Sequence, residues 1–131
     1  MKIIVDKIDE YPRHALSKSD VRLILSSVPP TWTEHVKVVR LSSSRSAASV
    51  ALFAHSVETL TIASRGHTKE RALHGVLVEL AAHASGFKCR TFQHLQSRYQ
   101  AKVESLVAPL MDELLHQFSQ RRASVSHDDV A

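Results

Sequence analysis

The segment from Thr68 to Gly86 constrains the fold more than any other, because it carries apolar residues on two faces at helical spacing. Thr68 can cap the first turn through its hydroxyl, and Gly86 can adopt the left-handed conformation that ends a helix. One face recurs every three or four residues and consists of Leu73, Val76, Leu77, Leu80 and Ala84. Val78 and Ala82 lie on the other side. We therefore expect a helix that is covered on both sides and lies at the centre of the domain.

Length and composition indicate one soluble domain. A chain of 131 residues can bury a core without metal ions or disulfides. Cys89 is the single cysteine, and we interpret it as a small reduced side chain because no partner base can be placed beside it. The opening MKIIVDKIDE does not suit a signal peptide, and no apolar run is long enough to cross a bilayer. We expect a cytoplasmic protein without a membrane partner.

The net charge of +4 is spread along the chain. Residues 1–68 carry nine Lys or Arg against six acids, and residues 69–131 carry eight against seven. This balance is typical of a solvated surface and disfavours a dedicated nucleic-acid-binding face.

The N-terminal part predicts a short strand followed by a helix. Ile3 to Val5 is an apolar run that suits an edge strand or a packed arm. Ser17 can cap a helix, and Asp20, three residues later, suits the positive end of its dipole. Pro29 and Pro30 end that helix.

Three further strands are predicted before the central helix. Residues 36–41, 50–55 and 57–62 are rich in β-branched and apolar residues, and the last two suit a strand pair or one long bent strand. The serine-rich link at 42–49 is interpreted as a surface loop. A phosphate site is disfavoured there because the link has no glycine to let the backbone wrap an anion.

A long amphipathic helix is predicted from Thr91 onwards, with Pro109 kinking it or starting a second helix. Its apolar stripe is Phe92, Leu95, Tyr99, Val103, Leu106, Leu110, Leu114 and Phe118. The pattern is lost after residue 118, so we expect a domain at 1–118 and a disordered tail at 119–131. The predicted fold is α+β: an N-terminal helix, a sheet of three or four strands, a central helix, and a long helix or kinked helix pair packed on it.

The phrase Leu77-Val78-Glu79-Leu80-Ala81-Ala82-His83 resembles the active-site helix of minimal zincin-like metallopeptidase domains of the gluzincin kind. That helix has the pattern His-Glu-x-x-His within a longer Leu-His-Glu-Leu-Ala-His-His phrase. Glu79, Leu80, Ala81 and His83 match it, whereas Val78 and Ala82 stand at the two metal-binding histidine positions. The resemblance covers roughly 17–86 and implies the family's helix, short sheet and active-site helix.

The two departures from that motif argue against catalysis. Paired imidazoles four residues apart hold Zn²⁺, and the glutamate between them takes a proton from the metal-bound water. Val78 and Ala82 have no lone pair to offer, so we expect no metal, no cofactor and no peptidase activity. Glu79 and His83 could hold a metal as a displaced pair, but two ligands are one short of an ordinary catalytic site. A hydrogen bond or ion pair at the core edge is the favoured interpretation of these two residues.

The expected function is therefore protein binding. The stripe from Phe92 to Phe118 could pair with a partner helix or a second copy of the chain, or simply cover its own sheet. The alternative is a nucleic-acid or anionic-partner surface on the acid-free segment 86–102, through Lys88, Arg90, Arg98 and Lys102. Phe92 and Tyr99 fall on the core stripe there, which would leave them unavailable for base stacking.

Overall fold

The computed structural model describes residues 1–44, 50–53, 58–86 and 92–130, with side chains to residue 120. Within these residues the chain has three α-helices and a four-stranded mixed sheet, which is the α+β class that the sequence predicts. The elements in order are β1 (Lys2–Val5), α1 (Lys18–Ser27), the 3-10 turn η1 (Pro30–Trp32), β2 (Val38–Leu41), β3 (Ala51–Leu52), β4 (Thr59–Ile62), α2 (Lys69–Ala84), the 3-10 turn η2 (Phe92–His94) and α3 (Ser97–Val130).

The sheet has the strand order β1-β2-β4-β3. The first three run parallel, with Val39 opposite both Ile3 and Leu60, and β3 is an antiparallel edge strand. The predicted pairing of the runs at 50–55 and 57–62 is confirmed by the register of Ala51 with Ile62. The strand predicted at 36–41 begins two residues later, at Val38, and the run at 57–62 forms β4 from Thr59. Residues 45–49 of the serine-rich link and residues 54–57, which end one predicted strand and begin the next, lie outside the described part.

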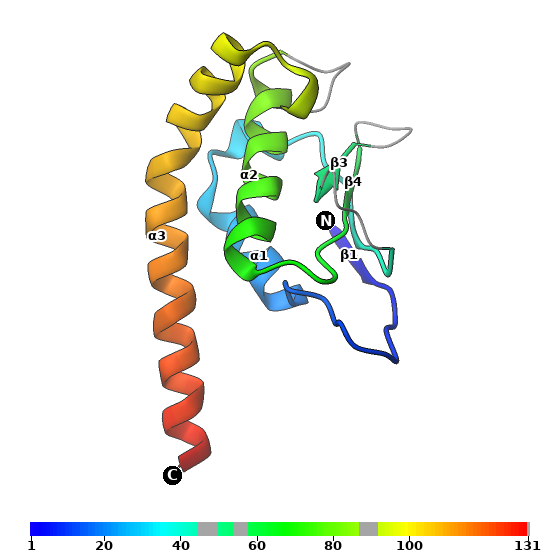
Figure 1. The fold of residues 1–131 in the computed structure, drawn as a ribbon, viewed down its shortest axis with the longest axis vertical. Coiled ribbons are helices and arrows are strands. Elements are labelled where there is room, and N and C mark those ends of the chain that lie inside the picture. The colour runs from blue at the N-terminus through cyan, green and yellow to red at the C-terminus, as the bar shows by residue number, and fades with distance from the viewer. Residues whose placement is uncertain (45–49, 54–57, 87–91, 131) are drawn as a thin grey trace.

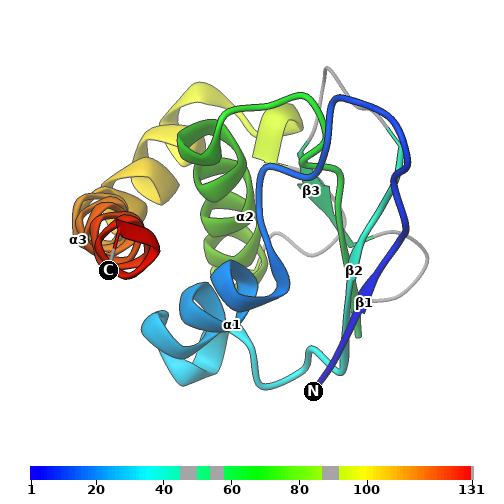
Figure 2. The same cartoon turned by 90° about the horizontal axis from the view of Figure 1, so that it is seen from below.

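Helix α2 lies between the sheet and α3, as the views along the domain show (Figures 1 and 2). Leu73, Leu77 and Leu80 are fully buried on one face. On the other face Val78 and Ala82 are 3% and 1% exposed, so the helix is covered on both sides as predicted. Ala84, the last residue of α2, is the exception, because it is exposed.

Both predicted helix caps are present. Ser17 and Asp20 form a reciprocal capping box at the start of α1, in which each side chain accepts a hydrogen bond from the backbone N–H of the other residue. Thr68 Oγ1 accepts from the N–H of Arg71 at 3.1 Å and caps α2. These bonds fix where each helix starts relative to the sheet.

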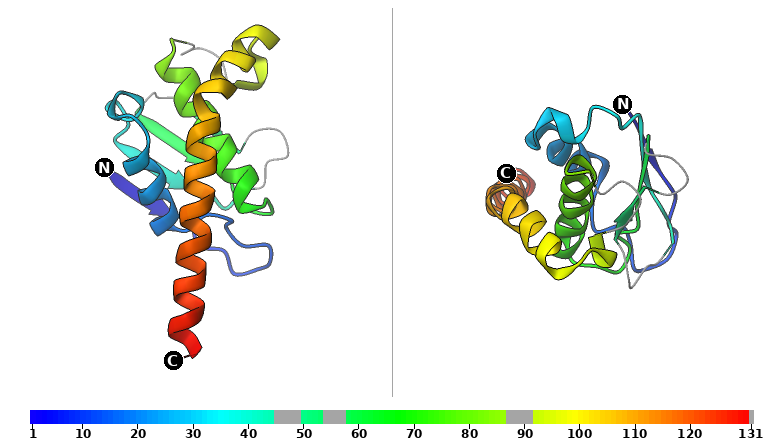
Figure 3. Two further views of the ribbon diagram at one scale, coloured as in Figure 1. Left: turned by 90° about the vertical axis from the view of Figure 1, so that its left-hand side faces the viewer. Right: turned by 90° about the horizontal axis from the view of Figure 1, so that it is seen from above.

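Helix α3 is one continuous helix of 34 residues that contains Pro109, not a pair. It begins at Ser97, after η2, and reaches Val130 through residues for which the sequence predicts a disordered tail. Its end extends past the rest of the domain (Figures 1 and 3). None of the described helices is long and apolar enough to span a membrane.

The predicted stripe is buried or half-buried except at one position, although its first two residues, Phe92 and Leu95, precede α3. Val103, Leu114 and Phe118 are buried, but Leu106 is 45% exposed and Val107 is fully buried in its place. A step of three residues from Val103 rotates Leu106 away from α2, whereas a step of four keeps Val107 on the buried line.

Candidate functional site

The second face of α2 borders a pocket of about 180 Å³ beside the edge strand β3. Helix α2 contributes one wall, the start of β3 a second, and η2 a third. The lining residues are Val50, Ala51, Arg71, His74, Gly75, Val78, Glu79, Phe92 and Gln93. Two of the motif positions singled out in the sequence, Val78 and Glu79, therefore border this pocket.

Gly75 sets the distance between α2 and the edge strand. A Cβ atom added to Gly75 would lie 2.7 Å from Cβ of Val50, closer than side chains approach one another. The absence of a side chain thus allows the helix to approach the start of β3 closely. The only sequence signal for this contact is a glycine in the interior of a helix, where it is otherwise unfavourable.

Glu79 is the buried acid of the pocket, 6% exposed. Its Oε1 accepts a hydrogen bond of 2.8 Å from the backbone N–H of Phe92. Burial raises the pKa of Glu79 to about 7, although the Phe92 N–H partly opposes this by stabilising the ionised form. The carboxyl can consequently hold or release a proton near neutral pH, a property found at structural as well as functional sites.

Helix α2 contributes two further polar residues to the pocket, His74 and Arg71. His74 Nε2 lies 2.7 Å from Oε1 of Glu104 and so connects α2 to α3. Arg71 is exposed on α2, one turn earlier. The lining of the pocket thus combines a cationic group, an imidazole paired with Glu104 and a buried carboxyl.

His83 lies in a different environment from Glu79. Its ring centroid is 4.1 Å from that of His35 and 4.7 Å from that of Phe53, and the residue is 7% exposed. Glu79 makes a hydrogen bond at the core edge, as expected, and its donor is the backbone N–H of Phe92. His83 instead packs in an aromatic cluster with His35 and Phe53. No sequence spacing pointed to His35 or Phe53, because they come from a loop and from beside β3.

The two positions that the resemblance assigns to metal ligands are part of the core. Val78 and Ala82 pack with the other buried apolar residues of the domain. Across the described residues, no three His, Cys, Asp or Glu side chains gather in a group that could hold a metal ion.

The basic segment is only partly described. Arg98 and Lys102 are exposed on the first turns of α3, and the guanidinium of Arg98 lies 4.6 Å from the ring centroid of Tyr99. Lys88 and Arg90, like Cys89, lie outside the described residues. Phe92 and Tyr99 are half-buried against the core, as predicted from the stripe.

Comparison of the chain with protein-family models, curated proteins and solved structures finds no match.

Proposed function

We propose that this chain is a zincin-like domain without a metal site, which acts by binding another protein and not by catalysis. The observation that carries the proposal is the pair Val78 and Ala82, at the positions where the resemblance expects imidazoles. Both side chains are apolar and almost completely buried, at 3% and 1% exposure. Without a metal-bound water, Glu79 has no acidified water molecule from which to take a proton.

The arrangement of Glu79 supports a structural role for the carboxyl. Its Oε1 is engaged by the Phe92 N–H, which joins α2 to η2. A carboxyl that holds a backbone amide can be a feature of the fold alone. The proposal therefore assigns Glu79 to the wall of a binding pocket and gives it no step in a reaction.

The size of the pocket favours a protein partner over a small-molecule ligand. Its volume of about 180 Å³ lies below the range of about 300–1,000 Å³ that is usual for small-molecule sites. A pocket of this size suits a single anchoring side chain of a partner protein. Val50 and Val78 would contact the apolar part of that side chain, and Arg71 could donate hydrogen bonds to a carboxylate or amide at its end.

The non-catalytic part of the proposal is tested by metal analysis and hydrolysis assays on protein purified without an affinity tag. We expect substoichiometric zinc and no cleavage of a mixed peptide library. Stoichiometric zinc together with cleavage that disappears in Glu79→Gln would overturn the proposal.

The binding part is tested by photo-crosslinking in the cells that produce the protein. A photoreactive residue replaces Gln93, which lines the pocket, and a matched control replaces Gln96, which is exposed but does not line it. We expect a discrete protein adduct from position 93 that weakens in Arg71→Glu. The same adducts from both positions, or an adduct indifferent to Arg71→Glu, would contradict binding at this pocket.

A further inference from the structure

A second and larger cavity lies beneath the N-terminal arm, which we define as residues 6–16 between β1 and α1. Its volume is about 480 Å³, within the usual range for small-molecule sites. The arm forms much of the wall, and the first residues of α1 and α2 complete it. The lining residues are Val5, Asp6, Lys7, Ile8, Arg13, His14, Ala15, Leu16, Ser17, Lys18, Asp20 and Lys69.

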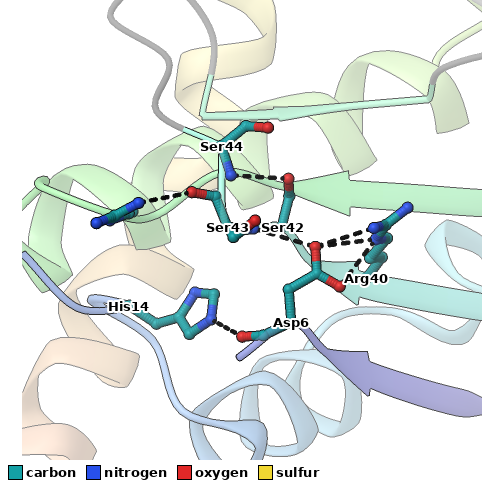
Figure 4. A network of polar contacts seen from close by, with 7 residues as sticks. Asp6, His14, Arg40, Ser42, Ser43 and Ser44 are labelled. Atoms are coloured by element: carbon teal, nitrogen blue, oxygen red, sulfur yellow. Dashed lines mark hydrogen bonds and ion pairs between the residues drawn. The ribbon is translucent and has the colours of Figure 1, made fainter. Parts of the chain in front are cut away.

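The arm is held at its start by a polar network at the carboxyl ends of β1 and β2 (Figure 4). Asp6 Oδ2 accepts hydrogen bonds from Arg40 Nη2 at 3.0 Å and from the N–H of Ser43 at 3.2 Å. His14 Nε2 lies 2.8 Å from the backbone oxygen of Asp6, which joins the two ends of the arm. These contacts close the arm into a loop around the cavity.

The far end of the arm is fixed from the β4 side. Arg65 donates to the carbonyl oxygens of Pro12, at 2.7 Å, and Ser43, at 3.2 Å. Ser64 is fully buried, and its Oγ accepts from the N–H groups of Ala15 at 3.1 Å and Leu16 at 3.4 Å. The cavity is therefore framed by a segment with several fixed points, and a ligand would find its walls already in place.

The charge of the lining is positive. Four of the lining residues are Lys or Arg and two are Asp. Both acids have cationic partners, since Asp6 pairs with Arg40 from outside the lining and Asp20 with Lys69 at 3.0 Å. In the described part of the chain, no ion pair involves Arg13 or Lys18, and both side chains are exposed. Arg13 and Lys18 thus bring positive charge to the lining that no described ion pair engages, and Arg13 Nη1 also donates to the carbonyl oxygen of Ile8 at 3.1 Å.

The same cavity has apolar walls. Val5 is 44% exposed and Ala15 is half-buried, and both line it together with Ile8 and the buried Leu16. Apolar side chains beside cationic ones match a molecule that has an apolar body and an anionic end. We propose that the cavity under the arm binds a small organic anion, a carboxylate or phosphate ester with an apolar chain. This inference is independent of the Glu79 pocket and of the protein partner proposed for it.

The proposed binding mode assigns separate roles to the two kinds of lining residue. The anionic group lies at Arg13 and Lys18, where charge-assisted hydrogen bonds are available, and the apolar chain lies against the accessible side chains of Val5 and Ala15. Affinity should fall as ionic strength rises, because the cationic side chains are exposed and screened by salt.

The test is a calorimetric titration of the full chain with octanoate, octyl phosphate, octanol and inorganic phosphate. We expect both octyl anions to bind, and octanol and inorganic phosphate to bind about tenfold more weakly or not at all. The ratio of octanoate to octyl phosphate affinity identifies the preferred anionic group. Absence of binding by both octyl anions at millimolar concentration, or equal binding of octanol, would overturn the proposal.

Variants locate the binding in the cavity. Arg13→Gln with Lys18→Gln should lower the affinity for the preferred anion about tenfold, whereas the matched control Arg22→Gln, an exposed residue of α1 that does not line the cavity, should leave it unchanged. Thermal melts establish that each variant is folded. If the double variant proves unfolded, Lys18→Gln alone carries the test. Equal affinity in the folded variants and the wild type would contradict the assignment.

Discussion

The carboxylate of Glu79 accepts a hydrogen bond of 2.8 Å from the backbone N–H of Phe92, and this bond ties the central helix α2 to the turn that precedes α3. The bond satisfies an amide that would otherwise need another partner. It is made by a carboxyl that is 6% exposed, and burial raises its pKa to about 7. Ionising Glu79 is therefore unfavourable in the folded protein, and this residue should make stability depend on pH near neutrality.

The first prediction concerns the sign of that dependence. The folded pKa of about 7 lies above the ordinary value of 4.5, so between these two pH values the folded state binds more protons than the unfolded state. The Glu79 contribution is most favourable below pH 4.5, declines by about 3 kcal/mol as pH rises through 7, and levels off above the folded pKa. Urea unfolding at a series of pH values measures the free energy of unfolding directly.

The variant Glu79→Gln isolates this effect. An amide oxygen can still accept the Phe92 N–H but does not ionise in this range. We expect the fall in stability between pH 4.5 and 7 to be much smaller in the variant. Parallel pH profiles for the two proteins would show that Glu79 does not titrate as described.

The second prediction concerns the contact between Gly75 and Val50. Alanine is a better helix former than glycine by about 1 kcal/mol, so propensity alone predicts that Gly75→Ala stabilises α2. The added Cβ would, however, lie 2.7 Å from Cβ of Val50 and force β3 away from the helix. We expect a net loss of about 1–3 kcal/mol, as is usual for overpacking, measured by chemical denaturation. An unchanged or raised stability would show that β3 adjusts without cost.

The features that could be predicted from the sequence are those determined by residues close together in the chain, such as helix caps and apolar faces. The hydroxyl of Thr68 and the reciprocal Ser17–Asp20 box act within three residues, so helix starts follow from the sequence. Burial of α2 on both faces also follows, because Val78 and Ala82 extend its apolar surface around the helix. The long helix was predicted, but the spacing rule allowed both Leu106 and Val107 and could not select the buried one.

The candidate sites depend on contacts between distant parts of the chain, and these have no local signal. Glu79 is recognisable in the motif, but its hydrogen bond to Phe92 depends on where the chain returns after α2. The cluster of His83 with His35 and Phe53 combines three separate segments. The cavity under the arm likewise requires Lys69 of α2 to meet Asp20 of α1, which spacing along the sequence does not indicate.

The third prediction concerns the Asp20–Lys69 pair. Burial alone would raise the pKa of Asp20, but the Ser17 N–H and the Lys69 ammonium outweigh it, so the pKa lies below 3.8. A lowered pKa stabilises the fold at pH values above 3.8, and this stabilisation is lost as pH falls through the folded pKa. Replacing Lys69 by Met should raise the pKa of Asp20, lower stability at neutral pH and weaken the loss on acidification.

The matched control for that variant is Lys37→Met. Lys37 also forms an ion pair, at 3.2 Å with Glu58, but the side chains of both residues are more than half exposed. Exposed pairs contribute little, typically about 0–1 kcal/mol. Acid unfolding of the two variants followed by circular dichroism compares them. A shift of the acid midpoint in Lys37→Met as large as that in Lys69→Met would argue against a special role for the buried carboxylate.

The fourth prediction tests the resemblance to the metallopeptidase helix. The double variant Val78→His with Ala82→His has two imidazoles four residues apart, with Glu79 between them, as in the His-Glu-x-x-His pattern of the zincin-like metallopeptidases. Val78 lines a pocket and has adjacent space, whereas Ala82 is 1% exposed, so the larger side chain there should cost about 1–3 kcal/mol.

Zinc should restore part of that loss in the double variant, because a ligand that binds only the folded state stabilises it by mass action. Thermal melts with zinc and with a chelator measure the effect, and the single variants Val78→His and Ala82→His provide the controls, since one imidazole cannot form the pair. We expect a zinc-dependent rise in melting temperature in the double variant that exceeds the sum of the rises in the singles. A double variant that is destabilised and indifferent to zinc would show that α2 shares only a short phrase with the metal-binding helix, and that Val78 and Ala82 never stood at ligand positions.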